Sequence, residues 1–256
     1  NSRVHDMETP GPHQWHLPQG FKVLDKIRSE FGLLPETRST LEVISDKLFI
    51  IHSAPEFDRR CEPFESAVYV GGEIYRPDLF TPPLEEIEIS KQLDKKVIFC
   101  TSGTSFKDLT LAELWCKLAD HDYRVIISTG GMYELPEREN LSVYDFVNYA
   151  AVIPYVDLVV THCGTGTLYY AIHSGVPILC TPLMPEQEKN ALKVKNYGNG
   201  LFPENFNDET VFFDSVTELL TNPCYQIRAE QVKNMFALKG GYLKAADLIE
   251  KCMRQN

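Results

Sequence analysis

The 256-residue sequence predicts an α/β protein built on a doubly wound parallel sheet. Short apolar runs alternate along the chain with helical segments of roughly ten residues, which is the pattern of repeated β-α-β units. The clearest unit spans residues 158–180. There, an apolar strand enters a polar turn with two glycines, and a helix and a second apolar strand follow. The backbone N–H groups of such a turn favour an anionic ligand.

Composition narrows the possible function classes. The formal net charge is −11, which argues against nucleic acid as the main partner, because binding to a phosphate backbone needs clustered Lys and Arg. Seven cysteines without a CxxC pair are typical of a reducing compartment, so we expect a cytoplasmic protein. No apolar run approaches the ~18 residues of a membrane span, and we expect no transmembrane segment. No regular ligand spacing indicates a metal site.

The first part of the chain, residues 1–80, carries the weaker signals. Two helices and then two strands are predicted there: residues 21–31, 37–46, 47–52 and 67–70. A polar, proline-bearing loop is expected between the two strands, at residues 55–58. The run RPDLFTPP at residues 76–83 has the composition of a linker. We therefore expect a domain boundary that separates residues 1–80 from residues 81–256.

The larger part, residues 81–256, carries the alternating pattern. Its charged beginning, residues 82–96, is rich in Glu and Lys, and we expect a solvated surface without a role in a site. Strands are predicted after it at residues 97–100, 124–128, 141–144, 158–161, 176–180 and 200–202. Helices are predicted at residues 109–118, near 150, at 168–174, 187–197 and around 215–220, and in one or two segments up to residue 253.

Three loops follow predicted strands: residues 101–104, 129–131 and 162–167. They lie at the carboxyl edge of the sheet, where open parallel sheets bind their ligands. The third loop leads directly into a helix, whose N–H groups and positive dipole end suit a diphosphate. His162 adds a hydrogen-bond donor or a positive charge there. No GxGxxG stands at the first β-α turn and no GxxxxGK[ST] occurs, which argues against NAD and P-loop sites.

Five sequence blocks, in this order, resemble the UDP-glycosyltransferase-like family, whose GT-B fold has two facing Rossmann-like domains. They are VIFCTSGT from residue 97, YDFVNY from 144, HCGTGT from 162, GVP from 175 and PLMPEQEKNA from 182. Upstream, IIHSAPEFD and VYVGG are similar to the end of the family's N-terminal domain. The resemblance implies that residues 1–80 are the remnant of an acceptor domain with a linker, and that residues 81–256 are the nucleotide-sugar-binding domain.

The resemblance also implies a donor site in the larger domain. His162 would contact the donor's phosphates. Glu186 and Gln187 would bind hydroxyls of the transferred sugar, since a carboxylate beside an amide offers acceptors and donors together. Phe146 would stack on the nucleotide base, and the backbone of Val147 would contact the edge of that base. The other donor-binding positions are glycines and hydroxyl residues: Ser102, Gly103, Thr104, Gly164, Thr165, Gly166 and Thr167.

The sequence departs from the family's pattern in two places, one of which is a pair of residues. Tyr170 stands where plant and animal members have a Glu that holds both ribose hydroxyls. The expected donor is therefore a UDP-sugar or a TDP-sugar rather than strictly a UDP-sugar. Asn148 and Tyr149 replace a Pro-Gln pair beside the base, which affects the base pocket.

The implied reaction is the inverting, metal-independent transfer of a hexose from a nucleoside-diphosphate sugar, UDP-glucose-like, to a hydroxyl of a small-molecule or lipid acceptor. The nucleotide sugar is a co-substrate, and no cofactor is expected. The family's general base is a His of the N-terminal domain that we expect upstream of Asn1, so no catalytic residue is assigned here. His52, His121 and His173 are expected to be structural.

Two alternatives stay open. The chain is also interpretable as a donor-binding subunit or fragment that needs the N-terminal half as a separate partner chain for activity. The other alternative is a different GT-B enzyme, such as a nucleotide-sugar epimerase, which would need further carboxylates beside the donor.

Overall fold

The fold comes from a computed structural model that describes residues 26, 29–32, 48–58, 66–72, 74, 84–104, 107–132 and 134–254. The chain divides into two compact units, residues 51–62 with 69–246, and residues 1–50 with 63–68 and 247–256. The helices predicted at residues 21–31 and 37–46 lie largely or wholly outside the described residues. The linker predicted at residues 76–83 also lies outside them, so the boundary between residues 80 and 81 stays a prediction.

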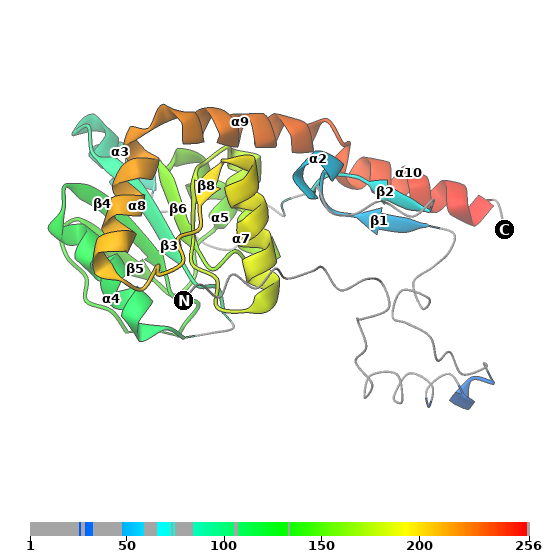
Figure 1. Cartoon of the computed structure of the whole chain (residues 1–256), viewed down its shortest axis with the longest axis horizontal. Coiled ribbons are helices and arrows are strands. Elements are labelled where there is room, and N and C mark those ends of the chain that lie inside the picture. Colours follow the sequence, from blue (N-terminus) through cyan, green and yellow to red (C-terminus); the bar gives the residue numbers. More distant parts are fainter. Residues whose placement is uncertain are drawn as a thin grey trace, which may run out of the picture. The chain divides into compact units, whose positions relative to one another are not determined.

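A six-stranded parallel sheet forms the centre of the larger unit (Figure 1). Its strands lie in the order β5 (Leu141–Tyr144), β4 (Tyr123–Ser128), β3 (Lys96–Thr101), β6 (Leu158–Thr161), β7 (Ile178–Cys180) and β8 (Gly200–Leu201). This order is that of a doubly wound sheet, so the predicted fold class is confirmed. The winding reverses between β3 and β6, where Thr101 is level with Thr161. Sheets of this kind bind ligands at that point.

Helices cover both faces of the sheet (Figure 1). On one face lie α4 (Leu109–Lys117) and α8 (Glu209–Thr221). The other face carries α3 (Leu84–Gln92), α5 (Tyr149–Val152), α6 (Thr165–Ser174), α7 (Pro185–Tyr197) and α9 (Pro223–Ala237). Successive strand residues point to opposite faces, so β3 gives Ile98 to the first core and Phe99 to the second. Burial on both faces explains why these strands are continuous apolar runs.

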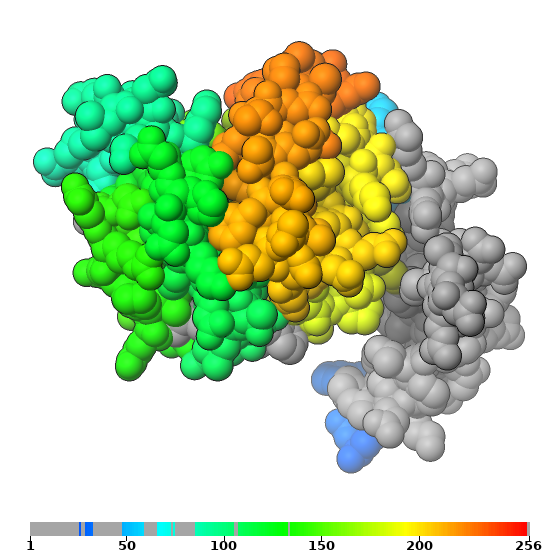
Figure 2. Space-filling view, turned by 60° about the vertical axis from the view of Figure 1, so that its left-hand side comes forward, coloured from blue at the N-terminus to red at the C-terminus, as the bar shows by residue number. Residues whose placement is uncertain are grey.

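The predicted helices and strands of residues 97–254 are confirmed, with shifts at their ends. α6 starts at Thr165 rather than at residue 168, and it stops as predicted at Gly175, which has a φ of 70°. α8 is longer than predicted because the carboxylate of Asp208 caps it by accepting the N–H of Val211 at 3.1 Å. The C-terminal helices are α9 and α10 (Gly241–Arg254). Figure 2 shows α8 and α9, in orange, beside the yellow α7.

A smaller sheet pairs the predicted strands β1 (Phe49–Ile51) and β2 (Ala67–Tyr69). The polar loop predicted between them at residues 55–58 is instead a helical turn, α2 (Pro55–Asp58). Its Phe57 is buried against Phe236 of α9, with ring centroids 5.5 Å apart. The prediction was wrong because one buried ring in a polar stretch produces no periodic pattern.

The charged run at residues 82–96 is also not the solvated surface that we expected. Most of it forms α3, in which Ile87 is 1% exposed. Glu86 of the same helix bonds to residues of strands β4 and β5. The buried face of α3 is narrow and partly polar, so hydrophobic periodicity did not reveal it.

Replacing Ile87 with Ala should lower the free energy of unfolding by about 2–4 kcal/mol, because it leaves a cavity under the sheet. The matched control is Ile89→Ala on the same helix, since Ile89 is 50% exposed and its loss should cost well under about 1 kcal/mol. Urea denaturation of both variants gives the comparison. Equal costs would contradict the packing of α3 described here.

Candidate functional site

Four loops meet at the carboxyl edge of the sheet. They follow β3, β4, β5 and β6, and they comprise residues 101–104, 129–131, 145–147 and 162–164. The register places Thr101 beside both Ser128 and Thr161, so these strands end at the same level. The predicted loops at residues 101–104 and 162–167 therefore come together at the reversal point of the sheet.

The imidazole of His162 lies between two glycines from different strands. A Cβ atom on Gly103 would lie 2.8 Å from Cε1 of His162, and one on Gly164 would lie 2.4 Å from its Nε2. Both distances are too short for a side chain, and Gly103 also has a φ of 70°. The ring thus fills a slot that exists only because both neighbours are glycine. His162 itself is 7% exposed.

Burial lowers the pKa of His162 below its ordinary value, although a hydrogen bond to the backbone of Thr101 and the nearby charge of Glu186 oppose this shift. The imidazole is therefore mainly neutral at pH 7. A neutral ring still has one N–H donor, and an adjacent anion would favour its protonation.

Helix α6 begins directly beside this ring. Gly164 is its N-cap residue and makes no side-chain capping hydrogen bond, so the first-turn N–H groups are available to a ligand. Thr165 and Gly166 are exposed at this end, and a Cβ on Gly166 would meet nothing within 4 Å, whereas Thr167 is buried. The turn before the helix is strained, since Cys163 has a φ of 62°.

Glu186 and Gln187, at the start of α7, have different surroundings. Oε1 of Glu186 accepts the hydroxyl hydrogen of Thr165 at 3.0 Å, which brings its carboxylate to the start of α6. Gln187 is 4% exposed, and its Oε1 accepts the N–H of Leu183 at 2.8 Å. The structure therefore leaves the amide group of Gln187 with its donors for a further partner, while Glu186 supplies acceptors.

Asn190 is a residue of the site that sequence reasoning missed. Its amide donates to the carbonyl of Cys163 at 3.0 Å and to Glu186 at 2.8 Å. It thereby fixes the strained turn and the carboxylate relative to each other. The signal was present in the block PLMPEQEKNA, whose second-to-last residue is this Asn.

The predicted base-binding residues lie at the end of β5. The ring of Phe146 is 49% exposed and stands next to Gly131, where a Cβ would be 3.9 Å from the ring. Val147 is buried in the core, so only its backbone is suited to contact a ligand. The loop is held by N–H groups of Thr129 and Gly130, which donate to the carbonyls of Tyr144 and Asp145, both at 2.8 Å.

The loop after β3 lies directly over the loop after β4. A Cβ on Gly130 would be 2.3 Å from the carbonyl oxygen of Gly103 and 3.1 Å from the methyl group of Thr104. Ser102 is buried, while Thr104 is exposed at the surface of the edge. The glycines therefore form a row of close contacts: Gly103 lies against the ring of His162, Gly130 against Gly103, and Gly131 beside the ring of Phe146.

The aromatic residues near the base loop pack into the core. The hydroxyl groups of Tyr149 and Thr101 are 3.0 Å apart, and the ring of Tyr149 contacts Phe99 at 5.2 Å and Tyr170 at 5.6 Å. Tyr170 is half-buried in this cluster. Tyr149 thus packs against the core at this point of the chain.

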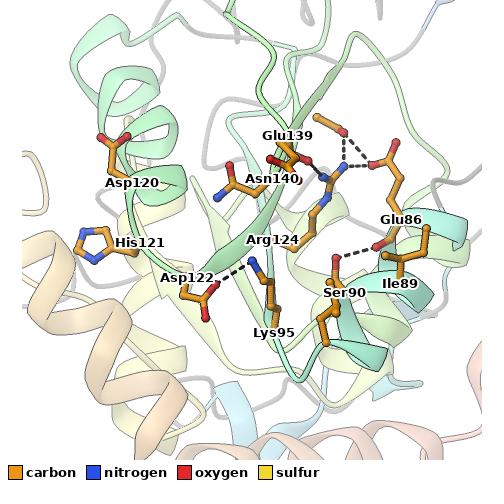
Figure 3. Close-up of a pocket in the computed structure, with 12 residues that line it drawn as sticks. Glu86, Ile89, Ser90, Lys95, Asp120, His121, Asp122, Arg124, Glu139 and Asn140 are labelled. Carbon is orange, nitrogen blue, oxygen red and sulfur yellow. Dashed lines mark hydrogen bonds and ion pairs between the residues drawn. The ribbon is translucent and has the colours of Figure 1, made fainter.

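Two cavities differ in their position on the sheet. One of about 420 Å³ lies at the carboxyl edge, and Gly131 and Asp145 are among its lining residues. The other, about 830 Å³, lies at the opposite edge between α3 and the starts of β4 and β5, around Arg124 (Figure 3). The smaller cavity adjoins the candidate site, and the larger one has no predicted donor-binding residue among its described lining.

Two other histidines of the described part of the chain lie away from the four loops. His121 packs on Phe213 at 4.7 Å, just before β4 and thus at the amino edge, and His173 packs on Phe236 at 6.1 Å near the end of α6. Among the residues that the structure describes, no group of three or more His, Cys, Asp or Glu is placed to hold a metal ion. None of the described helices is long and apolar enough to cross a membrane.

Comparison with known proteins identifies the family. Residues 112–241, just over half of the chain, match the family described as erythromycin biosynthesis protein CIII-like, C-terminal domain. The chain is 27% identical over 234 residues to 4'-demethylrebeccamycin synthase of Lentzea aerocolonigenes, and this alignment covers 88% of the chain and 55% of that protein. The chain therefore spans about half the length of this relative.

Solved structures share the fold. Spinosyn forosaminyltransferase is 18% identical with a TM-score of 0.71, over 95% of this chain and 63% of that one. The glycosyltransferase VinC, solved in complex with DTDP, is 20% identical with a TM-score of 0.66, over 93% and 59%. The architecture is therefore that of GT-B proteins. The chain belongs to the UDP-glycosyltransferase-like family, with a C-terminal domain of the erythromycin biosynthesis protein CIII-like type.

Proposed function

We propose that this domain binds the nucleoside-diphosphate sugar of an inverting glycosyltransferase, at the turn between β6 and α6. The observation that carries the proposal is the imidazole of His162, held between Gly103 and Gly164 at the start of the helix. An imidazole beside the first-turn N–H groups of a helix suits a diphosphate, because both donate hydrogen bonds to its oxygens. Membership of a glycosyltransferase-like family supports the same class of ligand.

The base and the hexose of the donor are assigned to residues on either side of His162 along the edge of the sheet. The base would lie on the exposed ring of Phe146, which offers a flat apolar surface beside Gly131. The transferred hexose would lie on the other side, where Glu186 offers acceptors and Gln187 offers donors to its hydroxyls.

Either uracil or thymine suits this assignment. The DTDP of the VinC structure supports a nucleoside diphosphate of this class. Tyr170 packs against Tyr149 and has no carboxylate to hold two ribose hydroxyls, which favours tolerance of a deoxyribose.

The proposed reaction is a displacement at the anomeric carbon of the donor sugar. The acceptor oxygen forms a bond to this carbon while the bond to the diphosphate oxygen breaks, and the leaving diphosphate takes the electron pair. The proton of the acceptor hydroxyl passes to a base that lies outside the described residues. His162 and the start of α6 would stabilise the charge on the leaving diphosphate, so the proposal needs no metal ion.

We propose that this chain binds the donor. Sugar transfer is proposed for the whole protein of which this domain is a part. The acceptor is proposed to be a hydroxyl group of a small molecule or a lipid. A second form of the proposal is a donor-binding subunit that needs the N-terminal half as a separate partner chain. Transfer activity assayed with and without the N-terminal half distinguishes these two forms of the proposal.

Titration calorimetry with UDP, TDP and ADP tests the donor site directly. Replacing His162 with Ala should weaken binding of the preferred diphosphate by about 1–3 kcal/mol, as expected for the loss of a hydrogen bond to a charged group. His121→Ala is the control, since His121 lies at the opposite edge of the sheet and should leave the affinity unchanged. No binding of any of the three nucleotides at millimolar concentration would overturn the proposal.

The affinity for a nucleotide sugar should also depend on pH through His162. Burial holds the pKa of the free imidazole below its ordinary value, and a bound diphosphate should raise it. The affinity should therefore rise as the pH falls from 8 toward the pKa of the free protein, because the imidazolium form binds the anion more tightly. Calorimetry between about pH 5.5 and 8 measures this slope, and it should vanish in His162→Ala. A nucleotide sugar is the right probe, since both ends of its diphosphate are esterified and keep their charge.

A further inference from the structure

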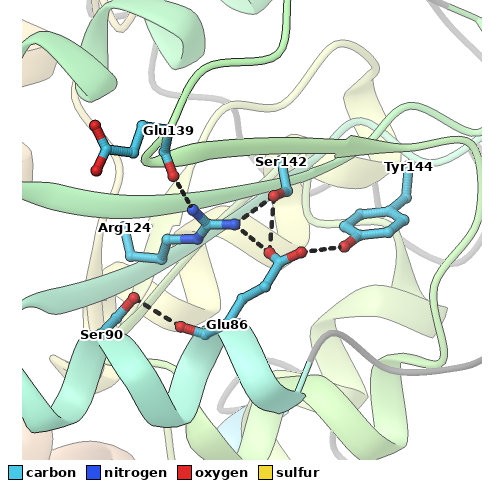
Figure 4. A network of polar contacts seen from close by, with 6 residues as sticks. All are labelled: Glu86, Ser90, Arg124, Glu139, Ser142 and Tyr144. Atoms are coloured by element: carbon cyan, nitrogen blue, oxygen red, sulfur yellow. Dashed lines mark hydrogen bonds and ion pairs between the residues drawn. The ribbon is translucent and has the colours of Figure 1, made fainter.

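A partly buried polar network ties α3 to the edge of the sheet (Figure 4). The carboxylate of Glu86 pairs with the guanidinium of Arg124 on β4. It also accepts hydrogen bonds from the hydroxyls of Ser142 at 2.7 Å and Tyr144 at 2.8 Å, both on β5. Arg124 is 8% exposed and donates in addition to the carbonyl of Glu139 at 2.6 Å. One carboxylate therefore holds two neighbouring strands.

The charge states make these contacts strong at neutral pH. Burial alone would raise the pKa of Glu86, but the hydrogen bonds from Ser142 and Tyr144 and the charge of Arg124 hold it below its ordinary value. Burial, together with the adjacent Glu86 carboxylate, raises the pKa of Tyr144 to about 12. The phenol is thus a protonated donor to an ionised acceptor, which is a charge-assisted hydrogen bond.

The end of β5 depends on this bond because β5 is an edge strand. It is four residues long, and β4 is its neighbour on one side only. Tyr144 is its last residue, directly before the loop at residues 145–147. Backbone hydrogen bonds from Thr129 and Gly130 fix this loop to the end of β4. The hydroxyl of Tyr144 adds a link from the last residue of β5 to Glu86 of α3, separate from these backbone hydrogen bonds.

We propose that Glu86 and Tyr144 are positioning residues for the nucleotide base, because their hydrogen bond fixes the end of β5 and with it the ring of Phe146. The inference rests on the proposed function, which places the base on that ring. The diphosphate is still assigned to His162 and the start of α6, which follow a different strand, β6. The pair therefore acts on the part of the affinity that comes from the base and not on the part that comes from the diphosphate.

The test compares a nucleoside diphosphate with inorganic diphosphate, which has no base. Tyr144→Phe removes one oxygen and keeps the ring in the core. It should weaken binding of UDP or TDP roughly three- to tenfold, as for a partly transmitted loss of one hydrogen bond, while the affinity for inorganic diphosphate stays unchanged. Tyr155→Phe is the matched control, since Tyr155 is exposed and lies away from this network. Hydrogen exchange of residues 145–148 should become faster in Tyr144→Phe only.

The set of outcomes distinguishes failure of the inference from failure of the proposed function. If the wild-type chain binds neither ligand, both fall together. If it binds UDP or TDP and Tyr144→Phe binds it equally well, the inference alone is overturned. Equal weakening of both ligands would also overturn it, because that result indicates general loss of structure. Glu86→Gln keeps a carbonyl acceptor for the phenol and should retain more of the base-dependent affinity than Tyr144→Phe.

Discussion

The slot that holds the His162 imidazole is the constraint on which the candidate site depends. Its walls come from the end of β3 and from the residue before α6, and each wall is a glycine because a Cβ would collide with the ring. The distance between the two loops is thus determined by contact of the glycine backbones with the imidazole ring, and not by flexible side chains. Such a position is well defined before any ligand arrives, which is what a diphosphate site needs.

The strained backbone of Cys163 lies in the same turn, directly beside the slot that holds His162. A non-glycine residue with a φ of 62° costs of order 1–3 kcal/mol, so the surrounding structure must hold it. Its side chain is buried, and its carbonyl accepts the amide of Asn190 from α7. The contact has a second effect, because the same amide binds Glu186. The strained turn and the proposed sugar-binding carboxylate are therefore fixed by one side chain.

The sequence predicted those parts of the fold that have a periodic apolar pattern or a glycine at a fixed place after a strand. The buried strands are continuous apolar runs, and the glycines at 103 and 164 follow strands directly, so the sheet and the turn were predictable. Glu86 and Ile87 gave no such signal: one charged and one apolar residue within a charged run are typical of a solvated helix. The contacts of Glu86 are made with Arg124 and Tyr144, which are distant in sequence, and only the folded sheet brings them together. Ile87 is buried in a core whose other residues come from distant elements.

The net charge of −11 does not exclude an anionic ligand, because the groups close to a site can outweigh the charge of the whole chain. At the turn, the groups that would face the proposed diphosphate are backbone N–H dipoles and an imidazole that burial keeps mainly neutral. This arrangement supplies hydrogen-bond donors that carry little net charge before the bond is cleaved. As negative charge develops on the leaving group, protonation of the imidazole becomes more favourable, so the stabilisation increases along the reaction. In the proposed function, the low pKa of His162 is therefore an advantage for transfer, because it shifts stabilisation from the bound donor toward the transition state.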